Sequence, residues 1–202
     1  MKRAGAEAAA QAMRALRASI DAYSPVSDAT WRALGAICRV EDVPRGHILY
    51  PAGDRPTSFA FVYRGLFRVY VTDDKGNEYN KNFFDEGKYP GPMVALLTAT
   101  RSEATIEALE DATVVSIDFR GYRRLLGASD DLKMYHIHYL EQNWLLAKDS
   151  REIALVQDDA TQRYLTFLDN HGAIAGRIPQ YHIASHLGIT PTQLSRIRKT
   201  LE

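Results

Sequence analysis

A cluster of polar and basic side chains near the C-terminus has the chemistry that recognition of double-stranded DNA requires. Arg196 can hydrogen-bond to guanine in a bidentate manner, and Gln193 can do the same to adenine. Other hydroxyl and basic side chains nearby can hold phosphate oxygens. The predicted DNA-contacting residues are Thr190, Thr192, Gln193, Ser195, Arg196, Arg198 and Lys199.

Positive charge is concentrated at this end of a chain whose formal net charge is zero. Residues 177–202 hold four basic side chains, including Arg177, and one acidic side chain, which gives a net charge of +3. Residues 141–159 hold two basic and five acidic side chains, which gives −3. Because contact with phosphates depends on local charge, a neutral total remains compatible with nucleic acid.

Two short helices that meet at Gly188 must position these side chains. Pro179 suits the first position of the first helix, and Gly188 supplies the left-handed residue that ends it. Ile189 is expected to fill the turn. The predicted buried face of this helix consists of Ile183, Ala184 and Leu187.

The second helix carries the candidate DNA contacts. We expect Thr190 to cap it and Pro191 to occupy its first position. Its predicted inward face consists of Leu194, Ile197 and Leu201. This pattern is typical of a helix-turn-helix over residues 178–200, whose second helix enters the major groove. The alternative is a helical hairpin with a solvated basic face.

The rest of the chain predicts a β domain between helical segments. Residues 4–20 are good helix formers. From residue 39 to about 119, short strand-like runs alternate with Gly, Pro and Asp clusters, as in a sandwich or barrel. Residues 130–156 contain neither Pro nor Gly and carry an apolar stripe that includes Leu132, Tyr135 and Tyr139. A helix of this length is too long to be buried on a small domain, so we expect it to self-associate.

Several segments have a recognisable sequence. They are IASHLGIT and LSRI (183–190 and 194–197), PRG with Gly53 (44–46), VYRG and RVY (62–65 and 68–70), and EALEDA with Val115 (107–112). Through them the chain resembles the CRP/FNR family of transcription regulators over nearly its whole length. The resemblance implies an α+β fold, with an N-terminal jelly-roll-like β-roll, a long dimerisation helix and a small C-terminal helix-turn-helix domain.

The resemblance also divides the chain. Residues 1–128 are expected to form helices plus a cyclic-nucleotide-binding-like β-roll that serves as the effector domain. Residues 129–157 are expected to form the dimerisation helix. Residues 158–202 are expected to form the DNA-binding domain, without the β-hairpin wing that usually follows in the family.

An effector pocket is implied within residues 87–105. Cyclic-nucleotide binders of the family carry a Glu for the ribose hydroxyl and an Arg for the cyclic phosphate. Here Pro92 replaces that Glu and Ser102 stands at the Arg position, unless the loop gains one residue and Arg101 serves. We therefore expect weak or no binding of cyclic AMP, and either another effector or none. The candidate pocket residues are Gly91, Met93, Val94, Arg101, Ser102 and Glu103.

The recognition helix also departs from the family pattern. Pro191 and Thr192 stand where the best-known members place Arg and Glu, so only Arg196 matches their base-reading residues by type. The DNA site should therefore differ from the common family sequence.

Metal, cofactor and catalytic chemistry are not expected. Cys38 is the single cysteine, which excludes an intrachain disulfide or cysteine-ligated cluster, and we expect it to be buried rather than reactive. A jelly-roll metal triad needs several histidines, and the β region holds only His47. His182 and His186 share a helix face without a third ligand, so a solvated face is the favoured interpretation. His136 and His138 are expected to pack in the core or an interface.

The sequence therefore predicts a cytoplasmic, non-enzymatic regulator, since no apolar run is long enough to span a membrane and no secretory signal is present. The expected partners are double-stranded DNA, a second copy of the chain and a small-molecule effector. The alternative is a cyclic-nucleotide or small-ligand sensor, or an interaction module, without productive DNA binding.

Overall fold

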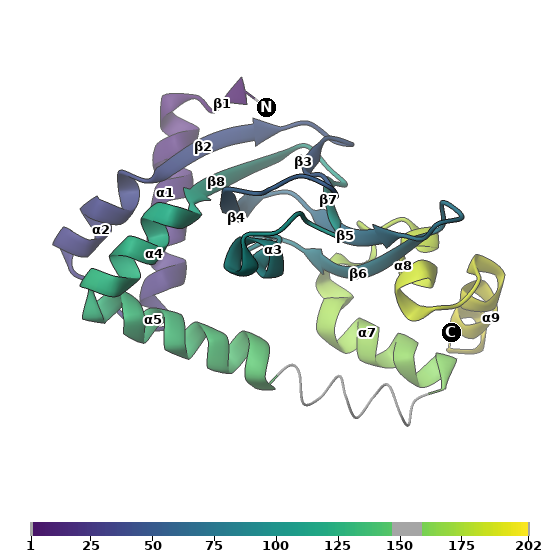
Figure 1. Cartoon of the computed structure of the whole chain (residues 1–202). Helices are drawn as coiled ribbons and strands as arrows, with labels where there is room; N and C mark the ends of the chain where they lie inside the picture. Colours follow the sequence, from purple (N-terminus) through teal and green to yellow (C-terminus); the bar gives the residue numbers. More distant parts are fainter. Residues whose placement is uncertain (1, 147–158, 202) are drawn as a thin grey trace.

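Two antiparallel four-stranded sheets form the centre of the molecule (Figure 1). The computed structural model describes residues 2–146 and 159–201. One sheet has the order β1-β2-β8-β4 and the other has the order β3-β7-β5-β6. The strands are β1 (Lys2–Arg3), β2 (Cys38–Val43), β3 (Ile48–Tyr50), β4 (Ser58–Arg64), β5 (Phe67–Thr72), β6 (Glu78–Phe84), β7 (Thr105–Ala108) and β8 (Ala112–Asp118).

The strand β4 shows how the roll is packed, because both of its faces are buried. Ala60 and Val62 face the core between the two sheets. Phe59 and Phe61 alternate with them and face a second core, which the helices cover. This double burial explains why the strand reads as a continuous apolar run rather than as an apolar–polar alternation.

Helices cover one sheet and extend toward the C-terminus (Figure 1). The described helices are α1 (Ala6–Asp21), α2 (Asp28–Gly35), α3 (Met93–Thr98), α4 (Phe119–Ala128), α5 (Asp130–Leu140), the π-helical turn η1 (Glu141–Leu145), α7 (Ala160–Ala175), α8 (Gln180–Leu187) and α9 (Pro191–Leu201). The helix α1 buries Ala12, Leu16 and Ile20 against the roll. The carboxylate of Asp131 joins α5 to the start of α2, since it accepts hydrogen bonds from Ser27 N and Thr30 Oγ1.

The apolar stripe on α5 has a different role from the one predicted. Leu132 and Tyr135 are buried in the core beneath the helices, and the Tyr139 ring lies 5.5 Å from that of Tyr23. This stripe attaches the helix to its own domain. Outside this stripe, exposed apolar side chains follow one another along α5, η1 and the residue after them: Met134, Ile137, Leu140, Trp144, Leu145 and Leu146. The remainder of the predicted helix, up to residue 156, lies largely outside the described residues.

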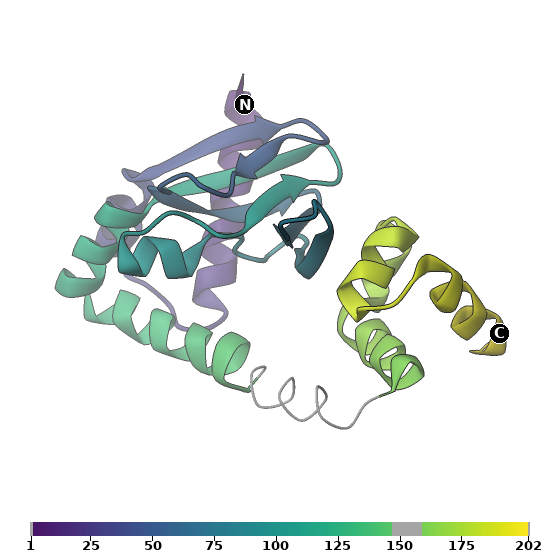
Figure 2. The ribbon, with the colours of Figure 1, turned by 45° about the vertical axis from the view of Figure 1, so that its right-hand side comes forward.

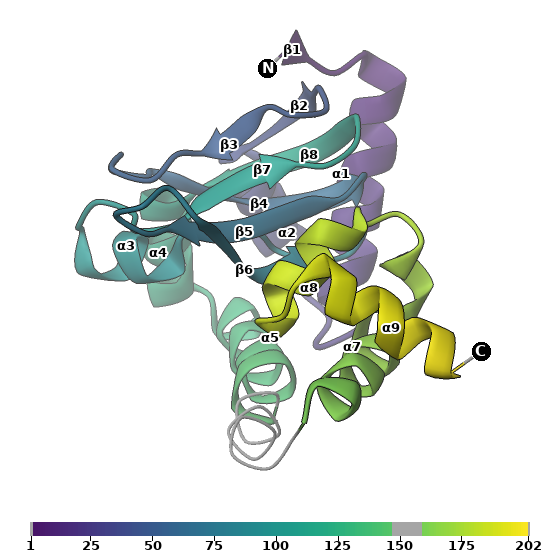
Figure 3. The same ribbon diagram turned by 90° about the vertical axis from the view of Figure 1, so that its right-hand side faces the viewer.

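The helix α8 lies beside the edge strand β6, and α9 extends from it away from the roll, as Figures 2 and 3 show from two directions. Leu66 and Phe83 of the roll share a hydrophobic core with Phe167 of α7 and Ile183 of α8. The Phe83 and Phe167 rings meet edge to face at 6.2 Å. The predicted β-roll and C-terminal helix-turn-helix are therefore both confirmed, and they are packed against each other.

Candidate nucleic-acid interface

The turn between α8 and α9 has the geometry that the sequence predicts. Gly188 adopts φ +68°, in the left-handed region that ends a helix, and the amide of Ile189 donates to Ala184 O at 3.0 Å. The predicted inner face is buried, with Ala184 fully inaccessible and Leu194 of α9 equally so. The two helices are therefore held at a fixed angle by close packing across the turn.

A reciprocal cap fixes the start of α9. Thr190 Oγ1 accepts from the amide of Gln193 at 3.2 Å, and Gln193 Oε1 accepts from the amide of Thr190 at 2.9 Å. This arrangement is a capping box. It confirms Thr190 as the cap and changes the assignment of Gln193, because the amide oxygen predicted to read adenine is already hydrogen-bonded within the helix.

The outer face of α9 presents most of the predicted DNA contacts to solvent. Exposed side chains from this set are Thr190, Thr192, Gln193, Ser195, Arg196 and Lys199, whereas Arg198 is half-buried. Ile197 is partly buried against the same core as Leu194. Leu201 does not face inward as predicted, since it is 46% exposed where α9 extends beyond that core.

Arg177 does not contribute to the basic surface, although it was counted in the local charge. Its guanidinium group donates to Glu110 Oε2 at 2.7 Å and to Glu86 Oε2 at 2.9 Å. These bonds raise the pKa of Arg177 and lower the pKa of Glu86 to about 2. Arg177 instead ties the C-terminal helices to the roll.

The expectation of a solvated face at His182 and His186 is wrong. His182 is only 5% exposed, and the Phe83 ring lies 5.5 Å from the ring of His186. This face of α8 is buried because it packs on β6 rather than standing in water. Among the described residues, no group of three or more His, Cys, Asp or Glu could hold a metal ion.

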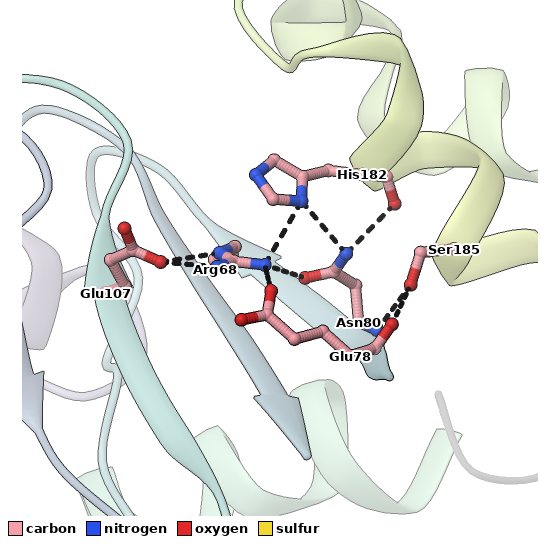
Figure 4. Close-up of polar contacts among 6 residues, drawn as sticks. All are labelled: Arg68, Glu78, Asn80, Glu107, His182 and Ser185. Atoms are coloured by element: carbon pink, nitrogen blue, oxygen red, sulfur yellow. Dashed lines mark hydrogen bonds and ion pairs between the residues drawn. The ribbon is translucent and has the colours of Figure 1, made fainter. Parts of the chain in front are cut away.

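Six residues, which we call the interdomain network, connect this face of α8 to the roll (Figure 4). They are Arg68, Glu78, Asn80, Glu107, His182 and Ser185. Arg68 donates to Glu78 Oε2 at 2.6 Å and meets His182 Nδ1 at 3.1 Å. Burial and the positive charge of Arg68 lower the pKa of His182 to about 4, so the ring is neutral at pH 7 and Nδ1 can accept. Sequence reasoning missed this network, because residues that contact each other in it are as far as 114 positions apart in the chain.

The candidate effector residues do not surround one cavity. A cavity of about 170 Å³ lies beside the β3–β4 loop, and of the six candidates only Ser102 lines it. The Arg101 side chain instead donates to the backbone oxygen of Gly53 at 2.6 Å. Gly91 packs against Phe59, where an added Cβ would come within 2.6 Å of the Phe59 Cβ.

The remaining candidates point elsewhere. Met93 is partly buried against the core beneath the helices, Val94 is 73% exposed, and Glu103 is exposed. The cavity is smaller than the roughly 300–1,000 Å³ typical of small-molecule sites.

The histidines of α5 pack as predicted, whereas Cys38 is half-buried rather than fully buried. His136 Nδ1 lies 3.1 Å from Tyr122 Oη, and His138 Nδ1 lies 3.1 Å from the backbone oxygen of Tyr23. The Cys38 thiol donates to Leu34 O at 3.2 Å, and burial raises its pKa to about 12. A thiol with this pKa is a poor nucleophile. Within the described residues, no helix has the length and hydropathy needed to cross a membrane.

Comparison with known proteins agrees with this architecture. Residues 40–129 match the model of the cyclic nucleotide-binding domain. The cAMP-activated global transcriptional regulator CRP of Pasteurella multocida is 23% identical over 152 residues, which cover 75% of this chain and 68% of that protein. Its counterpart from Escherichia coli O157:H7 is 21% identical over 151 residues, which cover 75% and 67%. By these matches the chain is similar to regulators of the CRP/FNR family.

Solved structures of family members share the fold. FixK2 from Bradyrhizobium japonicum superposes with a TM-score of 0.67 at 19% identity, covering 82% of this chain and 84% of that one. The c-di-GMP-responsive regulator CLP from Xanthomonas campestris superposes with a TM-score of 0.66 at 17% identity, covering 87% and 91%. CRP and CLP are described with different effectors, so similarity to these regulators does not fix the ligand.

Proposed function

We propose that this CRP/FNR-type chain is a transcription regulator that reads the major groove of DNA with α9. The observation that carries the proposal is the division of α9 into two faces. Leu194 is buried in the core shared with α8, while Thr192, Ser195 and Arg196 stand on the exposed side. A capped helix of this kind presents its polar face in a fixed orientation, as base reading requires.

Individual roles follow from the contacts. Arg196 is the base reader, because its guanidinium is exposed and can form a bidentate pair with guanine. Gln193 stiffens the start of the helix through its amide oxygen, which leaves its NH₂ group for a secondary contact. The phosphate contacts fall to Thr190, Thr192, Ser195, Arg198 and Lys199.

The active form is proposed to be a homodimer. The exposed face of α5 and η1 offers Ile137 at 45% and Trp144 at 53% exposure, in helical register with Met134. An apolar stripe of this kind on the outside of a helix suits a matching helix from a second copy. The dimer would place two α9 helices against two half-sites of DNA.

The effector is proposed to be something other than cyclic AMP, or to be absent. Pro92 offers no side-chain acceptor for a ribose hydroxyl. Arg101 is engaged with the backbone of the β3–β4 loop, and the adjoining cavity is about 170 Å³. Binding of a nucleotide would require this loop to rearrange.

Fluorescence anisotropy tests the proposal on DNA duplexes selected by the protein from a random pool. We expect binding that weakens steeply as salt rises, because counterions are released from phosphates, and that does not respond to cyclic AMP. Lys199→Ala should weaken binding to all duplexes alike and reduce the salt slope by about one unit. Failure to select any duplex would favour the alternative, an interaction module without productive DNA binding.

A further inference from the structure

The first helix of the helix-turn-helix is hydrogen-bonded to the edge strand of the roll. Ser185 Oγ donates to the backbone oxygen of Glu78 at 2.7 Å and accepts from the amide of Asn80 at 3.1 Å. His186 Nδ1 lies 3.1 Å from the backbone oxygen of Asn80. The helix α8 thus occupies hydrogen-bonding positions that an edge strand otherwise leaves open to solvent.

A buried charge lies at the centre of this contact. Arg68 is 5% exposed, and its guanidinium lies 2.6 Å from Glu107 Oε2 and 3.9 Å above the centre of the Tyr70 ring. Asn80 Nδ2 donates to the backbone oxygen of His182 at 3.3 Å. Burying a guanidinium group costs free energy unless each of its donors has a partner. Separating α8 from the roll would remove the His182 partner of Arg68 and expose the guanidinium to water.

The same arrangement restricts access of DNA to the N-terminal end of α9, which would contact the bases. Thr190 and Gln193 line a cleft of about 300 Å³ whose opposite wall contains Glu78 and Tyr79 of β6. The Glu78 carboxylate on that wall would repel the phosphates of a DNA backbone brought to this end of α9. N-terminal residues of a recognition helix are the ones that contact base edges in the groove.

We infer that this docked arrangement is an autoinhibited state, in which the interdomain network and the Arg177 ion pairs hold the helix-turn-helix against the roll. DNA binding then requires α8 to leave β6. The inference rests on the proposed function, which it deepens by naming the contact that regulates it. It assigns to Arg68, Asn80, His182 and Ser185 a role in holding the protein inactive rather than in reading DNA.

The network also reaches the candidate effector segment. The strand β7 begins at Thr105, three residues after Ser102, and Thr105 is paired with Tyr70 while Glu107 is paired with Arg68. A ligand that shifts the segment before β7 would therefore move Glu107 relative to Arg68. This continuity gives an effector event a direct physical route to α8.

A charge-neutralising variant on the roll side tests the inference without altering α9. Glu86→Gln combined with Glu110→Gln removes the ion pairs to Arg177, and both carboxylates are partly exposed, at 40% and 34%. Glutamine at position 86 can still accept from the amide of Gly65, which Glu86 does at 2.8 Å. A matched control, Glu7→Gln with Glu41→Gln, changes the net charge equally on α1 and β2.

Two readouts separate the inference from the proposed function. The first is affinity for selected DNA, which should be about fivefold tighter for the Glu86→Gln, Glu110→Gln variant than for the wild type or the control. The second is hydrogen exchange of β6 in the full chain, which should be faster in this variant without DNA and faster in the wild type when DNA is added. Ligand binding ordinarily slows hydrogen exchange. Faster exchange of the β6 amides on DNA binding is therefore expected only if α8 leaves β6.

The outcomes distinguish failure of the inference from failure of the proposed function. Unchanged or weaker DNA affinity in the variant, or unchanged exchange of β6 when the wild type binds DNA, would overturn autoinhibition and leave DNA binding intact. Absence of DNA binding in the wild type, the variant and the control would overturn the proposed function together with the inference. Equal tightening by the control variant would show a general charge effect and would also overturn the inference.

Discussion

Arg177, Gln193 and His182 show how side chains predicted from the sequence acquire different roles in the fold. Each was identified correctly as polar and close to the DNA-binding helices. Their partners, however, are residues that local patterns cannot predict: Glu86 and Glu110 for Arg177, and Arg68 for His182. The capping role of Gln193 was foreseeable, because Gln stands three residues after Thr190.

The titration of His182 gives a prediction at this scale. Its pKa in the docked state is lowered to about 4, first by burial and then by Arg68, against a small opposing effect of Glu78. Above pH 6.5 the ring is neutral whether docked or released, so docking is unaffected. Below pH 6.5 the released state binds a proton more readily, and docking should be weakened about tenfold at pH 5.5.

Nuclear magnetic resonance titration of the imidazole checks this expectation. The charged groups around His182 are Arg68 on β5 and Glu78 on β6, with Glu107 on β7 paired to Arg68. Glu86 remains ionised throughout, since its pKa is about 2. A His182 pKa near 6.5 in the DNA-free wild type would contradict the docked state, and in His182→Gln the effect of pH 5.5 on docking should be lost.

Helix ends that are determined by neighbouring residues in the sequence were predicted well. The αL residue Gly188, the cap at Thr190 and Pro191 at the start of α9 all occur as expected. The face of α5 was assigned wrongly, because a periodic apolar stripe does not reveal which surface covers it. Leu132 and Tyr135 pack on their own domain, and the exposed stripe lies on the other side.

Replacing Gly188 tests the turn on which the helix-turn-helix depends. A Cβ there would meet no atom within 4 Å, so the cost of Gly188→Ala arises from the positive φ alone. We expect a loss of about 1 kcal/mol of stability, measured by thermal unfolding. Gly172→Ala in α7 also meets open space but has a helical backbone, so it should stabilise by up to about 1 kcal/mol. An equal loss in both variants would contradict the argument.

For the whole molecule, the sequence predicted the kinds of domain but not how they contact each other. The shared core of Leu66, Phe83 and Phe167 depends on side chains that looked like ordinary strand and helix residues. Only their arrangement in three dimensions shows that α8 covers β6.

The exposed stripe on α5 and η1 gives a prediction at this scale. Ile137→Asp should weaken dimerisation by at least about tenfold, since a carboxylate would be buried in an apolar interface. Sedimentation velocity measures the shift from dimer to monomer. Ala10→Asp, on the exposed side of α1, introduces the same charge and should leave the dimer unchanged. A variant Ile137→Asp that remained dimeric would place the interface elsewhere.

Base reading by Arg196 is the central claim, and a comparison of affinities tests it most directly. The test uses two variants, Arg196→Ala and the matched control Arg124→Ala, whose residue is exposed on α4. Each variant is titrated with the selected duplex and with a set of duplexes in which one guanine at a time is replaced. The account predicts that Arg196→Ala costs about 1–3 kcal/mol on the selected duplex and removes discrimination at one guanine, while Arg124→Ala changes neither. Full discrimination in Arg196→Ala would contradict the claim that α9 reads DNA through this residue.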